Sequence, residues 1–170
     1  MTKTSFKLAG LVLAMIFLTG IAAAQNKTIL LVRHAEKDTS ESVDQNDPPL
    51  TDAGRARAER LLAILKRYKV GTVYSTDFRR TRETAGPVAR RRGLNVETYD
   101  AKKPDELIDR IMKSKTKRFL IVGHSNTVPG LANLLLKKKV FANLDDAEHG
   151  VIWLVRIKNG AVVKTQVLTY

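Results

Sequence analysis

The sequence predicts an α/β domain: a three-layer sandwich with a mostly parallel central sheet, helices on both faces and a C-terminal hairpin. Two observations support this fold. Short apolar runs, typical of strands buried on both faces, alternate along the chain with segments whose apolar residues have helical spacing. Near the C-terminus, Asn159 and Gly160 separate two runs rich in β-forming residues, and this dipeptide is a strong hairpin signal.

The expected strands are short. Residues 28–32 read Thr-Ile-Leu-Leu-Val, and residues 119–122 form a second wholly apolar run. Such continuous apolar runs indicate strands in the interior of a sheet. The remaining candidates are residues 70–74, 95–99, 151–157 and 161–168.

Helices are expected between these strands. A polar loop at residues 36–49 precedes Thr51, a typical N-cap residue, and apolar side chains then recur at helical spacing up to Tyr68. Residues 79–92 predict a helix disturbed near Pro87, which has no backbone N–H, and ended by Gly93. Two further helices are expected at residues 104–112 and 128–136.

Residues 1–24 have the pattern of a secretory signal peptide. Lys3 and Lys7 precede an apolar run at residues 8–21, and three alanines at 22–24 provide a cleavage site. The apolar run is shorter than the roughly 20 residues of a membrane-spanning helix. We therefore expect cleavage, a single domain at residues 25–170, no stable membrane anchor and a periplasmic or secreted location.

Composition narrows the possible chemistry. The chain has 30 basic and 17 acidic residues, a net charge of +13 that becomes +11 when Lys3 and Lys7 are lost with the signal peptide. This charge favours anionic ligands, but no nucleic-acid-binding motif accompanies it, so no specific nucleic-acid partner is expected. Cysteine is absent from the sequence, which excludes disulfides, thiolate nucleophiles and cysteine metal ligands.

Two histidines occupy equivalent places in the predicted fold. His34 follows the strand at 28–32, with Arg33 between, and His124 follows the strand at 119–122. Ligands of open α/β sheets gather beyond the carboxyl ends of the strands. If these strands are neighbours, both imidazoles point into one crevice. His149 precedes the hairpin, and we expect it to be structural or to line the rim.

Three arginines follow another candidate strand. Arg79, Arg80 and Arg82 begin the helix expected at 79–92. Guanidinium groups bind phosphoryl oxygens bidentately and neutralise their charge. The three cannot all face one point on a helix, so we expect one or two to reach the crevice and the others to pair with acids or face water.

Four segments resemble, in order and spacing, the motifs of the histidine phosphatase superfamily, which includes phosphoglycerate mutases and acid phosphatases. Residues 33–35 are similar to its Arg-His-Gly signature, with Ala35 in place of glycine. Residues 76–85 resemble the segment that carries the phosphate-binding arginine, which falls on Arg80. The other two segments are residues 50–54 and 122–125, and the resemblance covers residues 27–157. The short chain is similar to the single-domain branch of phosphohistidine phosphatases.

The resemblance implies a metal-independent phosphatase without a cofactor. In such an enzyme His34 attacks phosphorus and becomes a phosphohistidine, while Arg33, Arg80 and a protonated His124 hold the phosphoryl oxygens. The expected substrate is a small phosphomonoester or phosphohistidine. The carboxylic general acid of the family follows the third strand, where Asp100 is the best candidate, with Glu106 behind it.

Three other functions remain open at this point. An esterase nucleophile elbow is suggested by Gly123, His124 and Ser125, but Thr127 stands where that motif needs glycine. A zinc hydrolase is poorly supported, because the histidines are far apart in sequence. The third alternative is a non-catalytic anion-binding module of the same fold, and an intact His34 argues against it.

Overall fold

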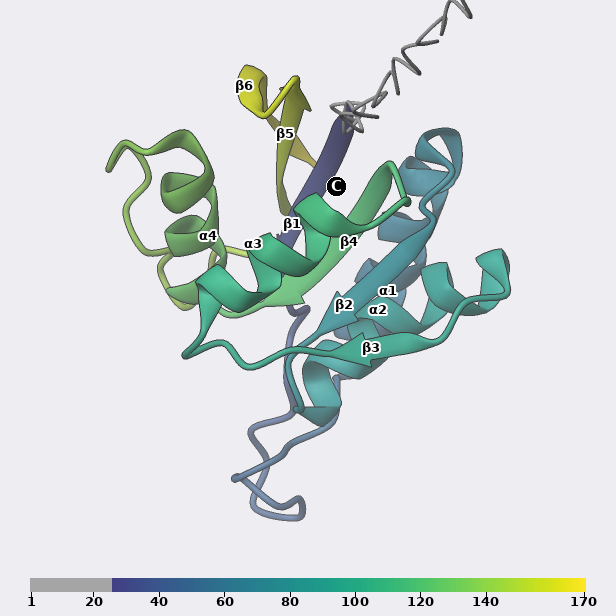
Figure 1. Ribbon diagram of the computed structural model, residues 1–170. Coiled ribbons are helices and arrows are strands. Elements are labelled where there is room, and N and C mark those ends of the chain that lie inside the picture. The colour runs from purple at the N-terminus through teal and green to yellow at the C-terminus, as the bar shows by residue number, and fades with distance from the viewer. Residues whose placement is uncertain (1–25) are drawn as a thin grey trace, which may run out of the picture.

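The computed structural model describes residues 26–170 (Figure 1). The predicted signal peptide at residues 1–24 lies outside the described residues, and its cleavage stays a prediction. Within residues 26–170, no helix has the length and apolar character needed to cross a membrane.

A six-stranded mixed sheet forms the centre of the domain. Its strand order is β3-β2-β4-β1-β5-β6, in which β3, β2, β4 and β1 are parallel and the two C-terminal strands pair antiparallel. This arrangement confirms the predicted parallel sheet with a C-terminal hairpin. The strands are β1 (Lys27–Arg33), β2 (Thr72–Ser75), β3 (Val96–Thr98), β4 (Arg118–Gly123), β5 (Val151–Lys158) and β6 (Ala161–Thr169).

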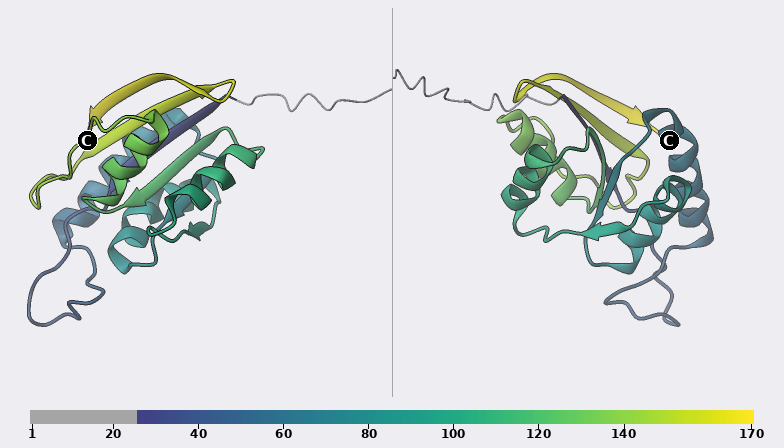
Figure 2. Two further views of the ribbon diagram at one scale, coloured as in Figure 1. Left: turned by 60° about the vertical axis from the view of Figure 1, so that its left-hand side comes forward. Right: turned by 45° about the vertical axis from the view of Figure 1, so that its right-hand side comes forward.

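Helices cover both faces of this sheet, as Figure 2 shows. The four helices are α1 (Asp52–Leu65), α2 (Arg79–Arg92), α3 (Pro104–Lys113) and α4 (Thr127–Leu136), and a short 3-10 helix, η1 (Lys66–Tyr68), continues α1. Helices α1 and α2 share a core with one face, and α3 and α4 share a core with the other. The three-layer sandwich is therefore confirmed.

Strand β1 shows why the sequence runs are continuously apolar. Ile29 and Leu31 belong to the core cluster under α3 and α4, whereas Leu30 and Val32 belong to the cluster under α1 and α2. All four side chains are fully buried. Since successive side chains of a strand point to opposite faces, a strand covered on both sides must be apolar at every position.

Helix α2 differs from the expectation in one respect. It runs without a break from Arg79 to Arg92, so Pro87 neither ends nor divides it. Proline removes only its own backbone donor, and the preceding Gly86 has no Cβ to clash with the ring. Pro87, Val88 and Ala89 are buried, and this packing offsets the missing hydrogen bond. Gly93 ends the helix with a positive φ of 63°, as predicted.

Candidate active site

The two histidines predicted to share a crevice do so. Strands β1 and β4 are parallel neighbours, with Arg33 opposite Gly123. The next residue of β1's segment, His34, donates its backbone N–H to the Gly123 carbonyl at 2.9 Å. The ring centroids of His34 and His124 are 5.4 Å apart, with the planes at 67°. The register of two buried strands thus brings together side chains 90 residues apart in sequence.

The imidazole of His34 is held in one neutral tautomer. Its Nδ1 lies 2.8 Å from the carbonyl oxygen of Ala35. Because a carbonyl only accepts, Nδ1 carries the proton and Nε2 keeps its lone pair. Burial lowers the pKa of His34 to about 3, and the positive charges of neighbouring His124 and Arg80 add to this effect. His34 therefore has the protonation state of a nucleophile.

His124 is oriented by Thr76, a residue that the sequence did not single out for this role. The buried Oγ1 of Thr76 lies 2.9 Å from Nε2 of His124 and 3.0 Å from Oγ1 of Thr81. The position was visible in the sequence as part of the segment 76–85, which also carries Arg80; the family motif usually has serine at position 76. The substitution keeps the hydroxyl group.

The protonated state of His124 that the resemblance implies is not the state favoured by the protein groups alone. Burial lowers its pKa to about 4, and the charges of Arg80 and Arg33 act in the same direction. A phosphate dianion between these groups has the opposite effect, since a nearby negative charge favours imidazolium. Protonation of His124 is therefore coupled to anion binding.

Of the three arginines at the start of α2, only Arg80 is turned towards the histidines. Arg79 pairs with Glu83 at 2.7 Å, and Arg82 pairs with Asp77. The Arg80 guanidinium lies 4.2 Å from the ring centroid of Phe78, whose edge contacts His124. The Nε of Arg80 is buried and has no hydrogen-bond partner.

Arg33 faces both the crevice and the segment before β5. Its Nη1 donates to the carbonyl oxygens of Asp145, at 2.6 Å, and Glu148, at 3.0 Å. Its Nε, like that of Arg80, is buried and lacks a partner. A buried donor without a partner costs about 1–3 kcal/mol, so an acceptor that reached either Nε–H group would be stabilised.

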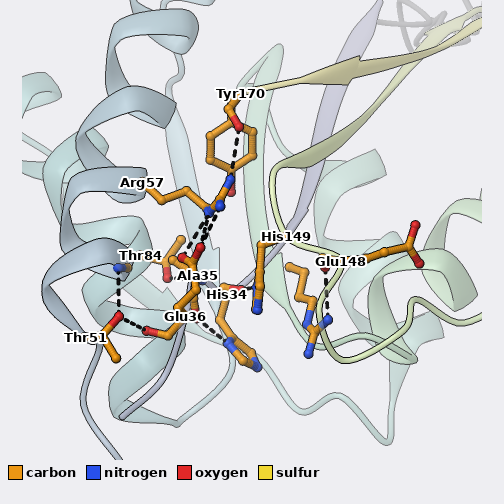
Figure 3. A network of polar contacts seen from close by, with 11 residues as sticks. His34, Ala35, Glu36, Thr51, Arg57, Thr84, Glu148, His149 and Tyr170 are labelled. Carbon is orange, nitrogen blue, oxygen red and sulfur yellow. Dashed lines mark hydrogen bonds and ion pairs between the residues drawn. The ribbon is translucent and has the colours of Figure 1, made fainter.

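The segment after His34 is fixed by a polar network (Figure 3). Both carboxylate oxygens of Glu36 accept from Arg57 at 2.6–2.9 Å, and this pair holds the pKa of Glu36 at about 2. Arg57 also donates to the Tyr170 carbonyl at 3.2 Å. The Ala35 N–H donates to Oγ1 of Thr84 at 2.9 Å. These contacts anchor the backbone after His34 to α1, α2 and the C-terminal strand.

His149 lies closer to the nucleophile than the sequence suggested. Its Nδ1 is 3.0 Å from the carbonyl oxygen of His34, and the two ring centroids are 6.1 Å apart. His149 lies two residues before β5, the antiparallel neighbour of β1. The start of β5 therefore meets the end of β1. Hairpin pairing to the first strand is the signal that could have placed this residue in the site.

Asp100 lies farther from the histidines. It is exposed, and its Oδ1 accepts from the Lys102 N–H at 2.8 Å. It borders a hollow of about 360 Å³ whose other walls include Thr76 and Phe78. Glu106, the second candidate, pairs with Lys103 at 3.1 Å on the exposed face of α3. Asp100 thus shares this hollow with Thr76 and Phe78, which both contact His124, and its role stays a prediction.

No group of three or more side chains among residues 26–170 is arranged to hold a metal ion. The positive charges around His34 come instead from Arg33 and Arg80, which act on the pKa of His34. Metal independence was predicted from the sequence because cationic side chains would supply the positive charge. Chelation of the active protein tests this prediction.

A family model described as the histidine phosphatase superfamily (branch 1) matches residues 29–103. That span contains Arg33, His34 and Arg80. This part of the chain matches the histidine phosphatase superfamily. No sequence among the curated proteins matches it.

Solved structures of the superfamily share this fold. The alpha-ribazole phosphatase of Shigella flexneri superposes with a TM-score of 0.70 at 16% identity, over 85% of this chain and 96% of the other. A mycobacterial glucosyl-3-phosphoglycerate phosphatase, in complex with inorganic phosphate, gives 0.65 at 15% identity, over 86% and 97%. An Agrobacterium tumefaciens protein, provisionally assigned as the phosphohistidine phosphatase SixA, gives 0.61 at 18%, over 82% and 97%. At such identities the likeness establishes the fold.

Proposed function

We propose that this chain is a phosphatase that hydrolyses a phosphomonoester or a phosphohistidine through a phosphohistidine intermediate on His34. One observation carries the proposal. His34 is neutral, with its Nε2 lone pair unprotonated, and it lies beside two arginines whose buried Nε–H groups have no partner. A nucleophile next to donors that lack an acceptor is suited to an electrophile that carries several anionic oxygens.

In the first step, Nε2 of His34 attacks phosphorus in line and the bond to the leaving oxygen or nitrogen breaks. Arg33 and Arg80 neutralise charge on the equatorial oxygens, and His124, oriented by Thr76, donates to a third. In the second step, water attacks the phosphohistidine, the P–N bond breaks and its electron pair returns to Nε2. Each step is easier than direct attack by water.

The comparisons support the substrate class. The Shigella flexneri and mycobacterial structures are of phosphatases, one of them in complex with phosphate, and the Agrobacterium protein is assigned to phosphohistidine. A chain of this fold, with a neutral histidine beside two arginines, is suited to the same class of ligand. Activity measurements on a panel of phosphorylated compounds that includes phosphohistidine would identify the substrate.

Location in the periplasm or outside the cell is part of the proposal. It is supported by the N-terminal sequence, which has the charged, apolar and small-residue regions of a signal peptide. Mass spectrometry of the native exported protein should find Gln25 at the N-terminus. A chain that keeps Met1 in the membrane fraction would contradict this part of the proposal.

The decisive experiment traps the intermediate. Wild-type protein mixed briefly with a phosphoryl-labelled substrate should carry an acid-labile, alkali-stable label. The variant His34→Asn is the matched test, because its amide N–H can replace the Nδ1 donor to Ala35 while the attacking Nε2 is lost. We expect no label and a turnover reduced by about three orders of magnitude or more. Phosphate binding without turnover in the wild type would instead indicate an anion-binding module.

A further inference from the structure

The leaving group requires a proton, and the carboxylates close to His34 are engaged elsewhere. Glu36 is paired with Arg57, and Asp146 lies 3.6 Å from Arg33. The charged groups that act on the pKa of His34 are all cationic. A phosphomonoester with an alkoxide leaving group needs an acid at this point, since an alkoxide leaves poorly without protonation.

His149 presents a ring nitrogen close to His34. Its Nδ1 faces the carbonyl oxygen of His34, which only accepts, so Nδ1 carries a proton. The other nitrogen, Nε2, has no hydrogen bond within the described residues. Figure 3 shows the His149 ring beside His34, with this second nitrogen on the side of the His34 imidazole.

The backbone next to His149 fixes this orientation. Gly150 has a positive φ of 84°, and a Cβ there would lie 2.6 Å from the Tyr170 carbonyl oxygen and 2.7 Å from Nη1 of Arg57. Only glycine fits both the conformation and the space. The backbone beside His149 is therefore fixed in one conformation, and the hydrogen bond from Nδ1 places the ring against His34.

We propose that His149 is the general acid and base of the site, a role that rests on the proposed function. As Nε2 of His34 bonds to phosphorus, the leaving oxygen takes the proton from Nε2 of His149, which gives an alcohol, phosphohistidine and a neutral His149. In the second step, neutral His149 takes a proton from the attacking water. The P–N bond breaks, and inorganic phosphate and protonated His149 result.

The charges around His149 are compatible with this cycle. Half-burial lowers its pKa, as do Arg33 and Arg57, whereas Glu36 and the hydrogen bond to His34 raise it. Neutral His149 is thus the state of the protein alone. A phosphomonoester has its second pKa near about 6, so a monoanionic substrate brings a proton that His149 can take up and deliver.

Two variants separate proton transfer from positioning. In His149→Asn the amide N–H can still donate to the His34 carbonyl, but the titrating Nε2 is lost; His149→Ala loses both. We expect kcat/KM of His149→Asn to fall about 100- to 10,000-fold for alkyl phosphates and less than about tenfold for aryl phosphates, whose leaving groups need little protonation. In His149→Ala both substrate classes should fall, because the nucleophile also loses a backbone contact.

The outcomes distinguish this proposal from the proposed function. Retained aryl phosphate turnover and labelling of His34 in His149→Asn would show that the phosphatase chemistry is intact. If the same variant hydrolysed alkyl phosphates as fast as the wild type, His149 would be a positioning residue, and the proposal would be overturned. Equal losses for both classes in His149→Asn would overturn it too. Alkyl-selective loss in Asp100→Asn but not in His149→Asn would assign proton transfer to Asp100.

Discussion

Burial of a neutral nucleophile predicts that the stability of the protein depends on pH in a specific window. The pKa of His34 is about 3 in the folded protein and near about 6.5 in an unfolded chain. Between these values the unfolded state binds a proton that the folded state does not. The free energy of unfolding therefore falls as pH falls below about 6.5, and no such loss occurs above it.

The expected magnitude follows from the size of the window. Within the range from pH 7 to pH 5, about 1.5 pH units lie below the pKa of the unfolded state. Over each of these units, proton binding stabilises the unfolded state by about 1.4 kcal/mol. His34 should thus reduce the free energy of unfolding by about 2 kcal/mol over this range. Glu36, with a pKa of about 2, stays ionised throughout and does not contribute.

Urea denaturation at pH 7, 6 and 5 measures this effect in the wild type and in His34→Asn. The asparagine keeps a donor for the Ala35 carbonyl but does not titrate. His124 and His149 contribute to both curves, so the difference between the two proteins isolates His34. Between pH 7 and pH 5, the free energy of unfolding should fall by about 2 kcal/mol less in the variant than in the wild type. Parallel curves would refute the buried neutral state.

Two further predictions concern metal independence and the end of β4. Phosphatase activity should survive extensive chelation, because Arg33 and Arg80 supply the positive charge; an enzyme that needs added zinc or magnesium would contradict this model of the site. Gly123→Ala should lower the free energy of unfolding by about 1–3 kcal/mol, because a Cβ there would lie 2.7 Å from the Tyr99 hydroxyl. The control Gly130→Ala, on α4 with open space around it, should stabilise by up to about 1 kcal/mol in the same denaturation experiment.

The fold and the main pair of histidines could be predicted because strong local patterns determine them. A strand buried on both faces must be apolar at each position, so β1 and β4 were recognisable within two residues. Residues directly after parallel neighbouring strands meet at one edge of the sheet. The proximity of His34 and His124 follows from that rule alone. Which of Arg79 and Arg80 faces the histidines depends on how α2 is oriented about its own axis, and the sequence does not give this orientation.

The residues that the sequence did not assign depend on contacts that no local pattern encodes. Thr76 acts through the distance between its hydroxyl and His124, 48 residues away. His149 contacts His34 because β5 pairs antiparallel with β1, and the hairpin signal predicts the turn but not the partner strand. The place of Asp100, on the exposed segment after the short edge strand β3, is likewise set by tertiary packing.

The end of β1 and the start of β5 hold each other in place, and under the proposed mechanism this arrangement would link anion binding to proton transfer. Arg33 donates to the carbonyls of Asp145 and Glu148, and the adjacent His34 accepts from His149. The segment 145–149 is therefore fixed by an arginine and the nucleophile itself, both from one strand end. The Nε–H of Arg33 has no partner within the described part of the chain, so an anion could bind to it. The same side chain donates to the backbone carbonyls just before His149, and an anion would therefore contact the residue that positions this segment. Loss of Arg33 should consequently impair phosphate binding and the placement of His149 together, whereas loss of Arg80 should leave the placement of His149 unchanged.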